Sequence, residues 1–432
     1  MDDAIMAKAT GMTSEARNEG PDLAPAAGSP STLPIRSLSA HPAGRRFRRV
    51  LCLDDFETAA KRHLPRPIFG YVAGAAETNS SFEDNRAAFA ELALVPRVLV
   101  DVSQRTLATS LFGRTYSAPF GIAPLGISAL YAYRGDLVLA RAAARQNVPM
   151  IMSGSSLIRL EHVVEENRAA WFQAYLPGDV TQITALIDRV ARAGFETLVL
   201  TLDTQVAGNR ENNVRAGFST PLRPSLRLAW DGVTHPRWLC GTFLRTLIQH
   251  GMPHFENNYA TRGAPILSAK VMRDYSDRGH LDWGHFAIIR RHWKGRLVVK
   301  GILDRDDARI ARDAGADGII VSNHGGRQLD GAVSALRALS GIVVTCPDIP
   351  VMMDGGVRRG TDVLKALALG ARFVFVGRPF AFAAAVGGQK GTHHAIALLS
   401  AEVSRNMAML GIKSLDELSA RHLFRLRGES PR

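Results

Sequence analysis

A histidine and an arginine three residues apart, His324 and Arg327, follow a short β-branched stretch at residues 318–321. The stretch Gly-Ile-Ile-Val is typical of a buried parallel strand. An imidazole can accept a proton near neutral pH, and a planar guanidinium can bind a carboxylate through two hydrogen bonds. The pair therefore indicates proton abstraction from a small carboxylic acid. Because a single histidine after a strand is more often a hydrogen-bonded core residue, this interpretation depends on the residues around it.

Two later apolar stretches, 351–354 and 373–376, end in glycines and arginines. Backbone N–H groups exposed at glycine, next to a guanidinium, suit the oxygens of a phosphate. In eight-stranded α/β barrels the loops after the seventh and eighth strands often bind phosphate. The pattern therefore predicts a phosphate site. The residues concerned are Gly355, Gly356, Arg358, Gly377 and Arg378.

Strand-like and helix-like stretches alternate between residues 120 and 377, which predicts an α/β protein with a (β/α)8 TIM barrel. The expected strands are residues 120–123, 150–153, 172–175, 197–203, 297–301, 318–323, 351–354 and 373–377. The expected helices include 135–146, 182–193, 306–314 and 363–369. The connection after the fourth strand, at about residues 210–293, is too long for a simple crossover and predicts a large insertion.

Active sites of such barrels lie at the C-terminal ends of the strands. The expected strands are closed by polar or charged side chains, so we expect these side chains to gather on one face of the barrel. They are Ser153, Gln173, Tyr175, Thr201, Asp203, Lys300, Ser322, His324, Asp354 and Arg378.

Composition places the chain among soluble globular enzymes: its 432 residues are 46% apolar and 22% charged. No apolar run approaches the roughly 18 residues of a membrane-spanning helix. Three scattered cysteines predict neither disulfides nor a metal site, so we expect a reducing cytoplasm. The net charge of +13 favours an acidic partner, but no nucleic-acid-binding motif is present. Residues 1–47, rich in Ala, Pro, Ser and Gly, predict a disordered leader before a barrel domain at 48–432.

The chain resembles the FMN-dependent α-hydroxy-acid dehydrogenase and oxidase family, which includes glycolate oxidase, L-lactate dehydrogenase and (S)-mandelate dehydrogenase. The resemblance runs from about Asp54 to Leu426 and is most specific at Ser322–Asp330 (SNHGGRQLD) and Asp354–Gly360 (DGGVRRG). It implies FMN as the cofactor and oxidation of an L-2-hydroxy acid, such as lactate or mandelate, to the 2-oxo acid. It also implies a homotetramer, since related barrels are commonly tetramers.

The resemblance implies that four residues take part in the chemistry: His324, Asp203, Tyr175 and Arg327. His324 would accept a proton from the substrate, and Asp203 would pair with the resulting imidazolium. A carboxylate beside a histidine favours the charged ring and fixes its tautomer, which agrees with this role. Asp203 could instead be a plain cap at the end of a strand.

Substrate binding is implied for Tyr71, Tyr175, Arg210, His324 and Arg327. Tyr71 and Tyr175 would hydrogen-bond the substrate carboxylate and the developing oxyanion or ketone. Arg327 and Arg210 would hold the carboxylate, because a planar guanidinium fixes an orientation that lysine cannot. Tyr71 could instead be a packing aromatic, and Arg210 could simply pair with Glu211.

The resemblance also implies which residues hold FMN. Lys300 would lie by the flavin pyrimidine ring, where its charge stabilises the anionic reduced form, although an isolated lysine is more often a solvated surface charge. Asp354 would hold the ribityl chain. The complete set is Ala123, Pro124, Ser153, Gln173, Thr201, Lys300, Ser322, Asp354, Gly355, Gly356, Arg358, Gly377 and Arg378.

The stretch 215–254 mixes arginines with tryptophans and leucines and has few acidic residues. Such a segment is typical of a peripheral membrane contact, which would bring the flavin near a quinone as electron acceptor. The alternative is an active-site lid that packs its apolar residues on the barrel. We expect a cytoplasmic protein, with peripheral contact at the inner face of the membrane.

Two other functions stay open. An oxidase of the same fold would pass its electrons to oxygen and form hydrogen peroxide. Gly126 favours a dehydrogenase, because oxidases of the family often have alanine there, and Leu125 replaces a threonine that many relatives use near the flavin. The second alternative is a non-catalytic barrel that binds membranes, and the intact catalytic set argues against it.

Overall fold

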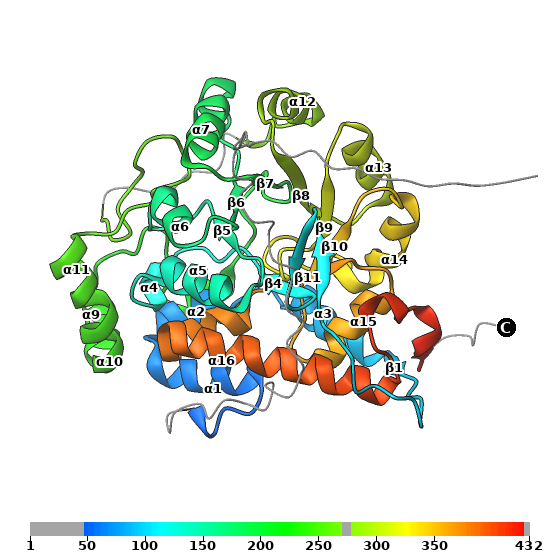
Figure 1. Cartoon of the computed structure of the whole chain (residues 1–432). Coiled ribbons are helices and arrows are strands. Elements are labelled where there is room, and N and C mark those ends of the chain that lie inside the picture. Colours follow the sequence, from blue (N-terminus) through cyan, green and yellow to red (C-terminus); the bar gives the residue numbers. More distant parts are fainter. Residues whose placement is uncertain (1–46, 270–277, 427–432) are drawn as a thin grey trace, which may run out of the picture. The chain divides into compact units, whose positions relative to one another are not determined.

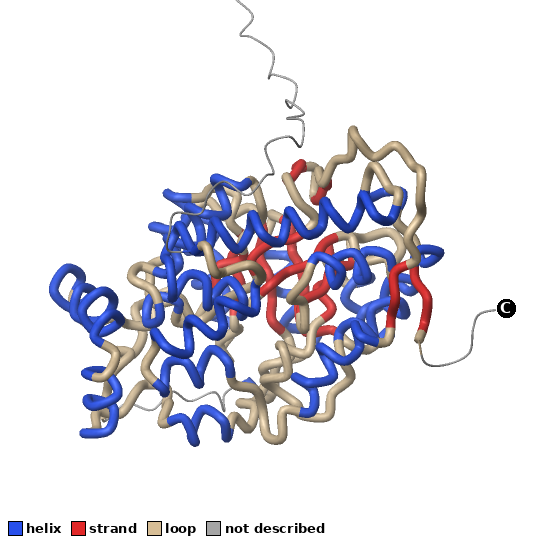
Figure 2. The backbone as a smooth tube through the Cα atoms, turned by 90° about the horizontal axis from the view of Figure 1, so that it is seen from below, coloured by secondary structure: helices blue, strands red, loops and turns tan. Residues whose placement is uncertain are grey.

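The computed structural model describes residues 47–269 and 278–426. Eight parallel strands form its centre and helices surround them (Figure 1, Figure 2). The strands are β4 (Phe120–Ile122), β5 (Ile151–Ser153), β6 (Trp171–Ala174), β7 (Thr197–Thr201), β8 (Arg296–Ile302), β9 (Gly318–Val321), β10 (Val351–Asp354) and β11 (Phe373–Val376). They pair in the order β4, β11, β10, β9, β8, β7, β6, β5, and a bridge from Ile122 to Met150 connects β4 with β5. The predicted TIM barrel is confirmed.

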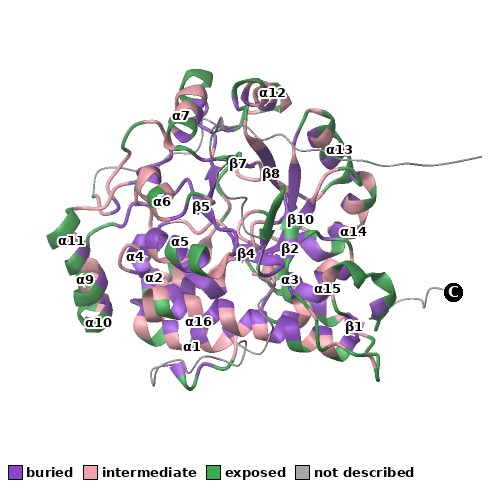
Figure 3. Cartoon of the chain, viewed as in Figure 1, coloured by how far each residue is buried: buried purple, intermediate pink, exposed green. Residues whose placement is uncertain are grey.

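The strands are buried over almost their whole length, as Figure 3 shows, because their residues are mainly β-branched, aromatic or otherwise apolar. Successive side chains point to opposite faces of the sheet. Val298 on β8 belongs to the cluster inside the barrel, whereas the next residue, Val299, packs with the surrounding helices. Both faces of the barrel wall are therefore apolar, and polar side chains are confined to the strand ends.

A hairpin of β2 (Thr109–Leu111) and β3 (Arg114–Tyr116) covers the N-terminal end of the barrel. Phe112 at its turn packs on Trp171, the first residue of β6, with ring centres 5.6 Å apart. Because this end is filled by apolar side chains, a polar site has room only at the opposite end of the strands.

A helix follows each barrel strand. These helices are α5 (Gly135–Gln146), α6 (Leu160–Glu166), α7 (Val180–Ala193), α12 (Trp283–His292), α13 (Arg305–Asp313), α14 (Ala335–Thr345), α15 (Gly360–Ala368) and α16 (Arg378–Leu410), the last interrupted at Gly388. Four of them match the predicted helices to within three residues at each end. Asp179 and Asp304 start α7 and α13 by accepting hydrogen bonds from backbone N–H groups of the first turn.

Outside the insertion, the remaining elements lie before β4, between β4 and α5, or after α16. They are α1 (Leu53–His63), α2 (Arg66–Ala73), α3 (Ser80–Ala90), β1 (Leu92–Leu94), α4 (Ser128–Tyr131, between β4 and α5), the 3-10 helices η5 (Leu415–Glu417) and η6 (Ala420–His422), and β12 (Leu423–Arg425), which pairs with β1. The predicted leader lies outside the described residues except for Phe47. That side chain is buried and stacks on His394 at 5.5 Å, so it belongs to the fold.

The predicted insertion leaves the barrel after β7. It contains α8 (Glu211–Ala216), α9 (Leu226–Val233), α10 (Pro236–Trp238), the π-helix η3 (Leu239–Leu244) and α11 (Arg245–His250). Helices α9, α10 and α11 lie at one side of the barrel (Figure 1). Helix α12 packs on α7 and leads into β8, so it is the crossover helix of the fourth unit and the insertion ends before it. No helix in residues 47–269 and 278–426 has the length and apolar character needed to cross a membrane.

Candidate active site

A cavity of about 460 Å³ lies at the C-terminal ends of the barrel strands. Most of the predicted site residues line it: Tyr71, Ala123, Pro124, Gln173, Tyr175, Thr201, Arg210, Lys300, His324, Arg327, Asp354, Gly355, Gly356, Arg358, Gly377 and Arg378. Three further predicted residues do not line it, but each hydrogen-bonds to a residue that does: Asp203, Ser153 and Ser322. The fold therefore brings the whole predicted set together.

His324 and Asp203 form a largely buried pair in which Nδ1 of the imidazole lies 3.0 Å from Oδ1 of the carboxylate. Burial lowers the pKa of His324 more than the Asp203 charge raises it, and Lys300 and Arg210 lower it further. Burial alone would raise the pKa of Asp203, but His324 and Lys300 hold it below its usual value. These directions favour, at neutral pH, a neutral imidazole that donates Nδ1–H to the carboxylate, which leaves Nε2 as the ring nitrogen able to accept a proton.

Backbone geometry fixes this pair. His324 has a left-handed conformation with φ +58°, which turns the chain sharply after β9, and its N–H donates to Ser322 Oγ at 3.0 Å. On β8, a Cβ at Gly301 (φ +105°) would lie 2.7 Å from Asp203 Cγ. Only glycine at this position lets the carboxylate approach the strand closely enough to meet the histidine.

Arg327 is bound to the backbone through one nitrogen and has a second nitrogen without a partner. Its Nη1 donates to the carbonyl oxygens of Tyr71 and Gly74 at 2.8 and 2.6 Å. Its Nη2 is buried and has no hydrogen-bond partner among the described residues. Burial, reinforced by the charge of Arg210, lowers the pKa of Arg327 to about 10. A carboxylate in the cavity would supply both the missing acceptor and the missing negative charge.

Arg210 enters the cavity from the first part of the insertion. Its Nε donates to the carbonyl oxygen of Arg327 at 3.1 Å, and its Nη2 donates to Gln328 Oε1 at 2.7 Å. Glu211 pairs with Arg215, so the alternative pairing of Arg210 with Glu211 is wrong. The two arginines of the predicted carboxylate clamp therefore lie side by side.

Lys300 is buried, which rules out the solvated surface lysine of the alternative interpretation. Its Nζ lies 3.1 Å from Asp354 Oδ2 and donates to Ser322 Oγ at 2.8 Å. Gln173 accepts a hydrogen bond from Ser153 Oγ at 3.2 Å through Oε1. Gln173 Nε2 and Asp354 Oδ1 are buried without a hydrogen-bond partner in the described part of the chain. A buried donor and a buried acceptor, both unpaired in one cavity, indicate that a polar ligand completes the site.

Positive charge is concentrated near the glycines that follow β10. Burial lowers the pKa of Arg378 far below its usual value, and the charges of Arg327 and Arg358 lower it further. A Cβ at Gly356 (φ +79°) would lie 2.0 Å from the carbonyl oxygen of Asn85, so only glycine fits there. The guanidinium of Arg378 is held by three backbone carbonyl groups, those of Val72, Gly74 and Gly325. An anion bound between Arg358 and Arg378 would offset the repulsion between these buried guanidinium groups.

The family model for FMN-dependent dehydrogenases matches residues 60–425. The chain belongs to this family. The predictions of the family, of FMN as the cofactor and of a dehydrogenase are confirmed, and the non-catalytic alternative is wrong. The unpaired amide of Gln173, the unpaired carboxylate oxygen of Asp354 and the buried guanidinium groups of Arg358 and Arg378 suit the ring, the ribityl hydroxyl groups and the phosphate of FMN.

Relatives of this dehydrogenase include L-lactate dehydrogenases, an (S)-mandelate dehydrogenase and mandelate oxidases. An L-lactate dehydrogenase of Pseudomonas entomophila is 39% identical over 376 residues, which cover 86% of this chain and 97% of the relative. One from Xanthomonas campestris pv. campestris is 38% identical over 390 residues, covering 88% and 98%. The crystal structure of the monotopic membrane protein (S)-mandelate dehydrogenase has a TM-score of 0.79 at 32% identity and covers 87% of this chain and 99% of its own. A mandelate oxidase structure with benzoyl-formic acid has a TM-score of 0.71 at 35% identity, covering 87% and 98%.

Sequence reasoning missed several residues of the cavity in this dehydrogenase. Arg278, from the end of the insertion, is buried and lies 5.9 Å from the ring centre of Tyr175. Phe218 packs on Tyr71, with ring centres 4.6 Å apart. Gln328 donates to the carbonyl oxygen of Asp203 at 2.8 Å and so connects the histidine loop with the aspartate loop. Only Gln328 carried a signal, because it stands inside the motif that contains His324.

Proposed function

We propose that this dehydrogenase oxidises an L-2-hydroxy acid of the lactate or mandelate type to the 2-oxo acid and passes the electrons to a quinone of the respiratory chain. The observation that carries the proposal is a neutral imidazole, held by Asp203, in the same cavity as the unpaired Nη2 of Arg327. A 2-hydroxy acid has a carboxylate for the guanidinium and a proton for the imidazole. The L-lactate and (S)-mandelate dehydrogenases among the relatives support this substrate class.

In this proposal His324 accepts one proton of the substrate through Nε2. Asp203 stays ionised and stabilises the imidazolium that forms, which lowers the barrier to proton transfer. Tyr175 lines the same cavity and hydrogen-bonds the oxygen at C2 as it becomes a carbonyl. Arg327, Arg210 and Tyr71 bind the carboxylate and so orient C2 toward the histidine.

FMN, when bound, accepts the two electrons that the substrate loses. Gln173 and Lys300 are proposed to contact its ring system, where the ammonium favours the anionic reduced form. Asp354 is proposed to accept hydrogen bonds from the ribityl chain through its unpaired Oδ1. The other residues proposed to hold the cofactor are Ala123, Pro124, Ser153, Thr201, Ser322, Gly355, Gly356, Arg358, Gly377 and Arg378.

The proposal is tested by an anaerobic half-reaction. Glycolate, L-lactate, a longer aliphatic L-2-hydroxy acid and (S)-mandelate are each mixed with the oxidised holoenzyme, and bleaching of the flavin is followed by stopped flow. L-lactate or (S)-mandelate should bleach it fastest, and no bleaching by any of the four would overturn the proposal. The reduced enzyme is then mixed with air or with a soluble quinone. Faster reoxidation by air would favour the second candidate, an oxidase, which the mandelate oxidase neighbours support.

The pH profile of kcat/KM should show an acid limb set by His324. Protonated His324 cannot accept the substrate proton, so activity falls as pH decreases through its pKa, which lies below the usual value. The Asp203→Asn variant removes the charge that raises this pKa, so its limb should move to lower pH. Its plateau should fall about 10²-fold, because an amide does not stabilise the imidazolium. A limb that stays in place in Asp203→Asn would contradict the pairing.

Gly126 sets the space next to Tyr71. A Cβ at residue 126 would lie 2.9 Å from Tyr71 Oη and 3.3 Å from Ser155 Cβ. The Gly126→Ala variant should therefore displace the phenol of Tyr71. KM for L-lactate should rise about tenfold, which corresponds to the loss of one hydrogen bond from this phenol to the substrate carboxylate. Steady-state kinetics with a quinone acceptor measure this. Gly241→Ala is the matched control, because a Cβ there meets nothing within 4 Å, and an equal rise in KM in both variants would refute the steric argument.

A quinone is proposed as the electron acceptor because the surface of the insertion suits a membrane contact. Leu226, Trp230, Val233 and Ile248 have exposed fractions of 93%, 68%, 60% and 83%. Trp238, in contrast, is buried and donates to the carbonyl oxygen of Leu130 at 2.8 Å. The segment 215–254 thus packs one face on the barrel and presents apolar side chains on another, as a peripheral membrane contact requires. We propose that the enzyme lies at the inner face of the cytoplasmic membrane, which sedimentation with vesicles tests. We also propose that it is a homotetramer, which sedimentation without vesicles tests.

A further inference from the structure

A second cavity, of about 220 Å³, lies where the end of α11 and the chain that follows it meet the barrel. The barrel contributes the start of α5 and the segment from residue 157 to 162. Five side chains of the lining carry or can carry positive charge, and one is acidic. The basic residues are Arg134, Arg159, His162, His250 and Arg262, and the acidic residue is Glu256.

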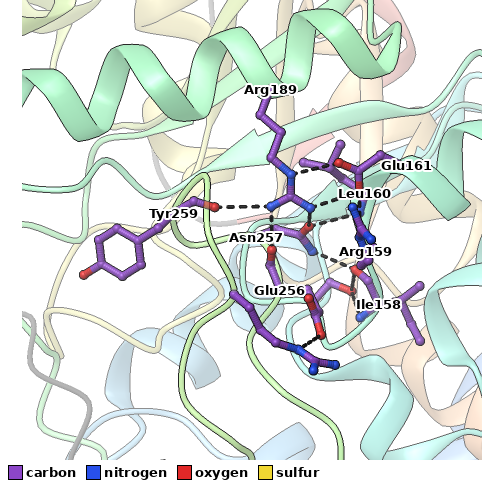
Figure 4. Close-up of polar contacts among 10 residues, drawn as sticks. Ile158, Arg159, Leu160, Glu161, Arg189, Glu256, Asn257 and Tyr259 are labelled. Carbon is purple, nitrogen blue, oxygen red and sulfur yellow. Dashed lines mark hydrogen bonds and ion pairs between the residues drawn. The ribbon is translucent and has the colours of Figure 1, made fainter. Parts of the chain in front are cut away.

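A network of hydrogen bonds and ion pairs holds one wall of this cavity (Figure 4). Arg189 donates to both carboxylate oxygens of Glu161 at 2.8 and 2.9 Å and to the carbonyl oxygen of Glu256 at 2.7 Å. Asn257 donates to the carbonyl oxygen of Ile158 at 2.7 Å and accepts from the N–H of Leu160 at 3.0 Å. The returning chain is thereby fixed to α6 and α7, so the cavity is preformed.

The positive charge in the cavity exceeds what its own acid can neutralise. Glu256 is buried and pairs with Arg262 at 2.8 Å, and Arg159 pairs with Glu161 at 3.4 Å. Arg134 is the arginine of this lining that has no carboxylate within 4.0 Å among the described residues. Arg134 Nη1 lies 3.5 Å from both ring nitrogens of His250. The guanidinium would therefore repel the imidazole if His250 became protonated. Partial burial and the nearby charges of Arg134, Arg245 and His162 lower the pKa of His250. An anion bound next to Arg134 would supply the negative charge that this guanidinium lacks.

The rest of the lining is apolar and continues toward the exposed surface of the insertion. Ala129, Leu157 and Met252 form part of the wall. Ile248, 83% exposed, stands two residues before His250 on α11, and Leu244 is 40% exposed one turn earlier. A basic cavity with an apolar wall, next to exposed apolar side chains, fits a ligand that has a phosphate at one end and hydrocarbon at the other.

We propose that this cavity binds the headgroup phosphate of an anionic glycerophospholipid, an inference that rests on the membrane contact proposed for residues 215–254. The phosphate lies between Arg134 and Arg159, and the glycerol and first acyl carbons lie on Leu157 and Met252. The cavity thus gives the peripheral contact a preference for anionic lipids. Nothing in this assignment involves the residues that hold substrate or FMN.

The direct test uses short-chain phosphatidylglycerol below its critical micelle concentration, so that no membrane surface is present. Binding to the holoenzyme is measured by ³¹P NMR line broadening. The Arg134→Gln/Arg159→Gln variant should bind at least tenfold more weakly, since each charged hydrogen bond contributes about tenfold or more. The control, Arg227→Gln/Arg237→Gln, removes the same charge from exposed positions of the insertion and should bind within twofold of the unaltered enzyme. Equal loss in both variants would overturn the proposal.

Two further binding experiments identify the ligand. Glu256→Gln removes the acid of the cavity and frees Arg262, so phosphatidylglycerol should bind severalfold more tightly. Inorganic phosphate lacks the hydrocarbon part and should compete only weakly, as should short-chain phosphatidylcholine. Competition by phosphate as effective as that of the lipid would assign the cavity to free phosphate instead and overturn the lipid assignment.

Vesicle sedimentation separates this proposal from the membrane contact itself. Vesicles of phosphatidylcholine alone are compared with vesicles that also contain phosphatidylglycerol. Leu226→Ser/Ile248→Ser should release the enzyme from both kinds, whereas Arg134→Gln/Arg159→Gln should remove only the preference for phosphatidylglycerol. If the enzyme does not sediment with vesicles but still binds short-chain phosphatidylglycerol, the membrane contact fails and the cavity assignment stands. Flavin reduction by L-lactate should be unchanged in all these variants, which shows that each is folded.

Discussion

The His324→Gln variant is expected to reduce flavin about 10³–10⁴-fold more slowly than the unaltered enzyme, at saturating L-2-hydroxy acid. Glutamine can take part in the hydrogen bond to Asp203 but cannot accept a proton at neutral pH. The unaltered imidazole can, because burial holds its pKa below the usual value while Asp203 stays ionised. Stopped-flow absorbance of the flavin under nitrogen measures the rate of this step without the reoxidation half-reaction.

The control measurement for this variant is FMN binding, which the substitution should leave unchanged. His324→Gln should bind FMN with unchanged stoichiometry, because the residues proposed to hold the flavin and its phosphate are not altered. The substrate should also still bind, since Arg327 and its contacts with the carbonyl groups of Tyr71 and Gly74 remain. A flavin-loaded variant that turns over at the full rate would show that another group is the base.

The Arg327→Ala variant is expected to lower kcat/KM for L-lactate about 10²–10³-fold, the range found when one partner of a buried charge pair is truncated. Alanine removes the unpaired Nη2 proposed to meet the substrate carboxylate and also leaves the carbonyl groups of Tyr71 and Gly74 without a donor. KM should rise more than kcat falls, because the carboxylate is bound in both the ground state and the transition state.

Arg327→Lys separates charge from geometry. Lysine keeps the positive charge but lacks the planar fork that reaches the backbone and the substrate together, so its kcat/KM should lie between those of alanine and arginine. Arg237→Ala, at an exposed position of the insertion, should leave kcat/KM unchanged. If alanine at position 327 kept kcat/KM within threefold of the unaltered enzyme, Arg210 would have to bind the carboxylate alone.

The strand ends explain why so much of the site follows from the sequence. A run of β-branched residues that ends in a polar residue predicts a buried parallel strand. It also predicts that the polar side chain lies at the C-terminal end of the barrel. Gln173, Lys300 and Asp354 were located in this way, and the cavity contains all three. The unpaired atoms of Gln173 and Asp354 and the ion pair between Lys300 and Asp354 could not be predicted, because they depend on the register between neighbouring strands.

The insertion shows where sequence reasoning stops. The sequence left a membrane contact and an active-site lid open for residues 215–254, but it did not predict that Phe218 and Arg278, from the two ends of the insertion, would line the cavity. Neither residue stands in a motif, and a long connection can fold back in many ways at similar cost in loop-closure entropy.

The three carbonyl groups that hold Arg378 come from two separate parts of the chain, Val72 and Gly74 at the end of α2 and Gly325 next to His324. One guanidinium thus connects the N-terminal helices to the loop that contains the proposed base. A displacement of α2 would therefore be passed to the loop of His324 through this one side chain.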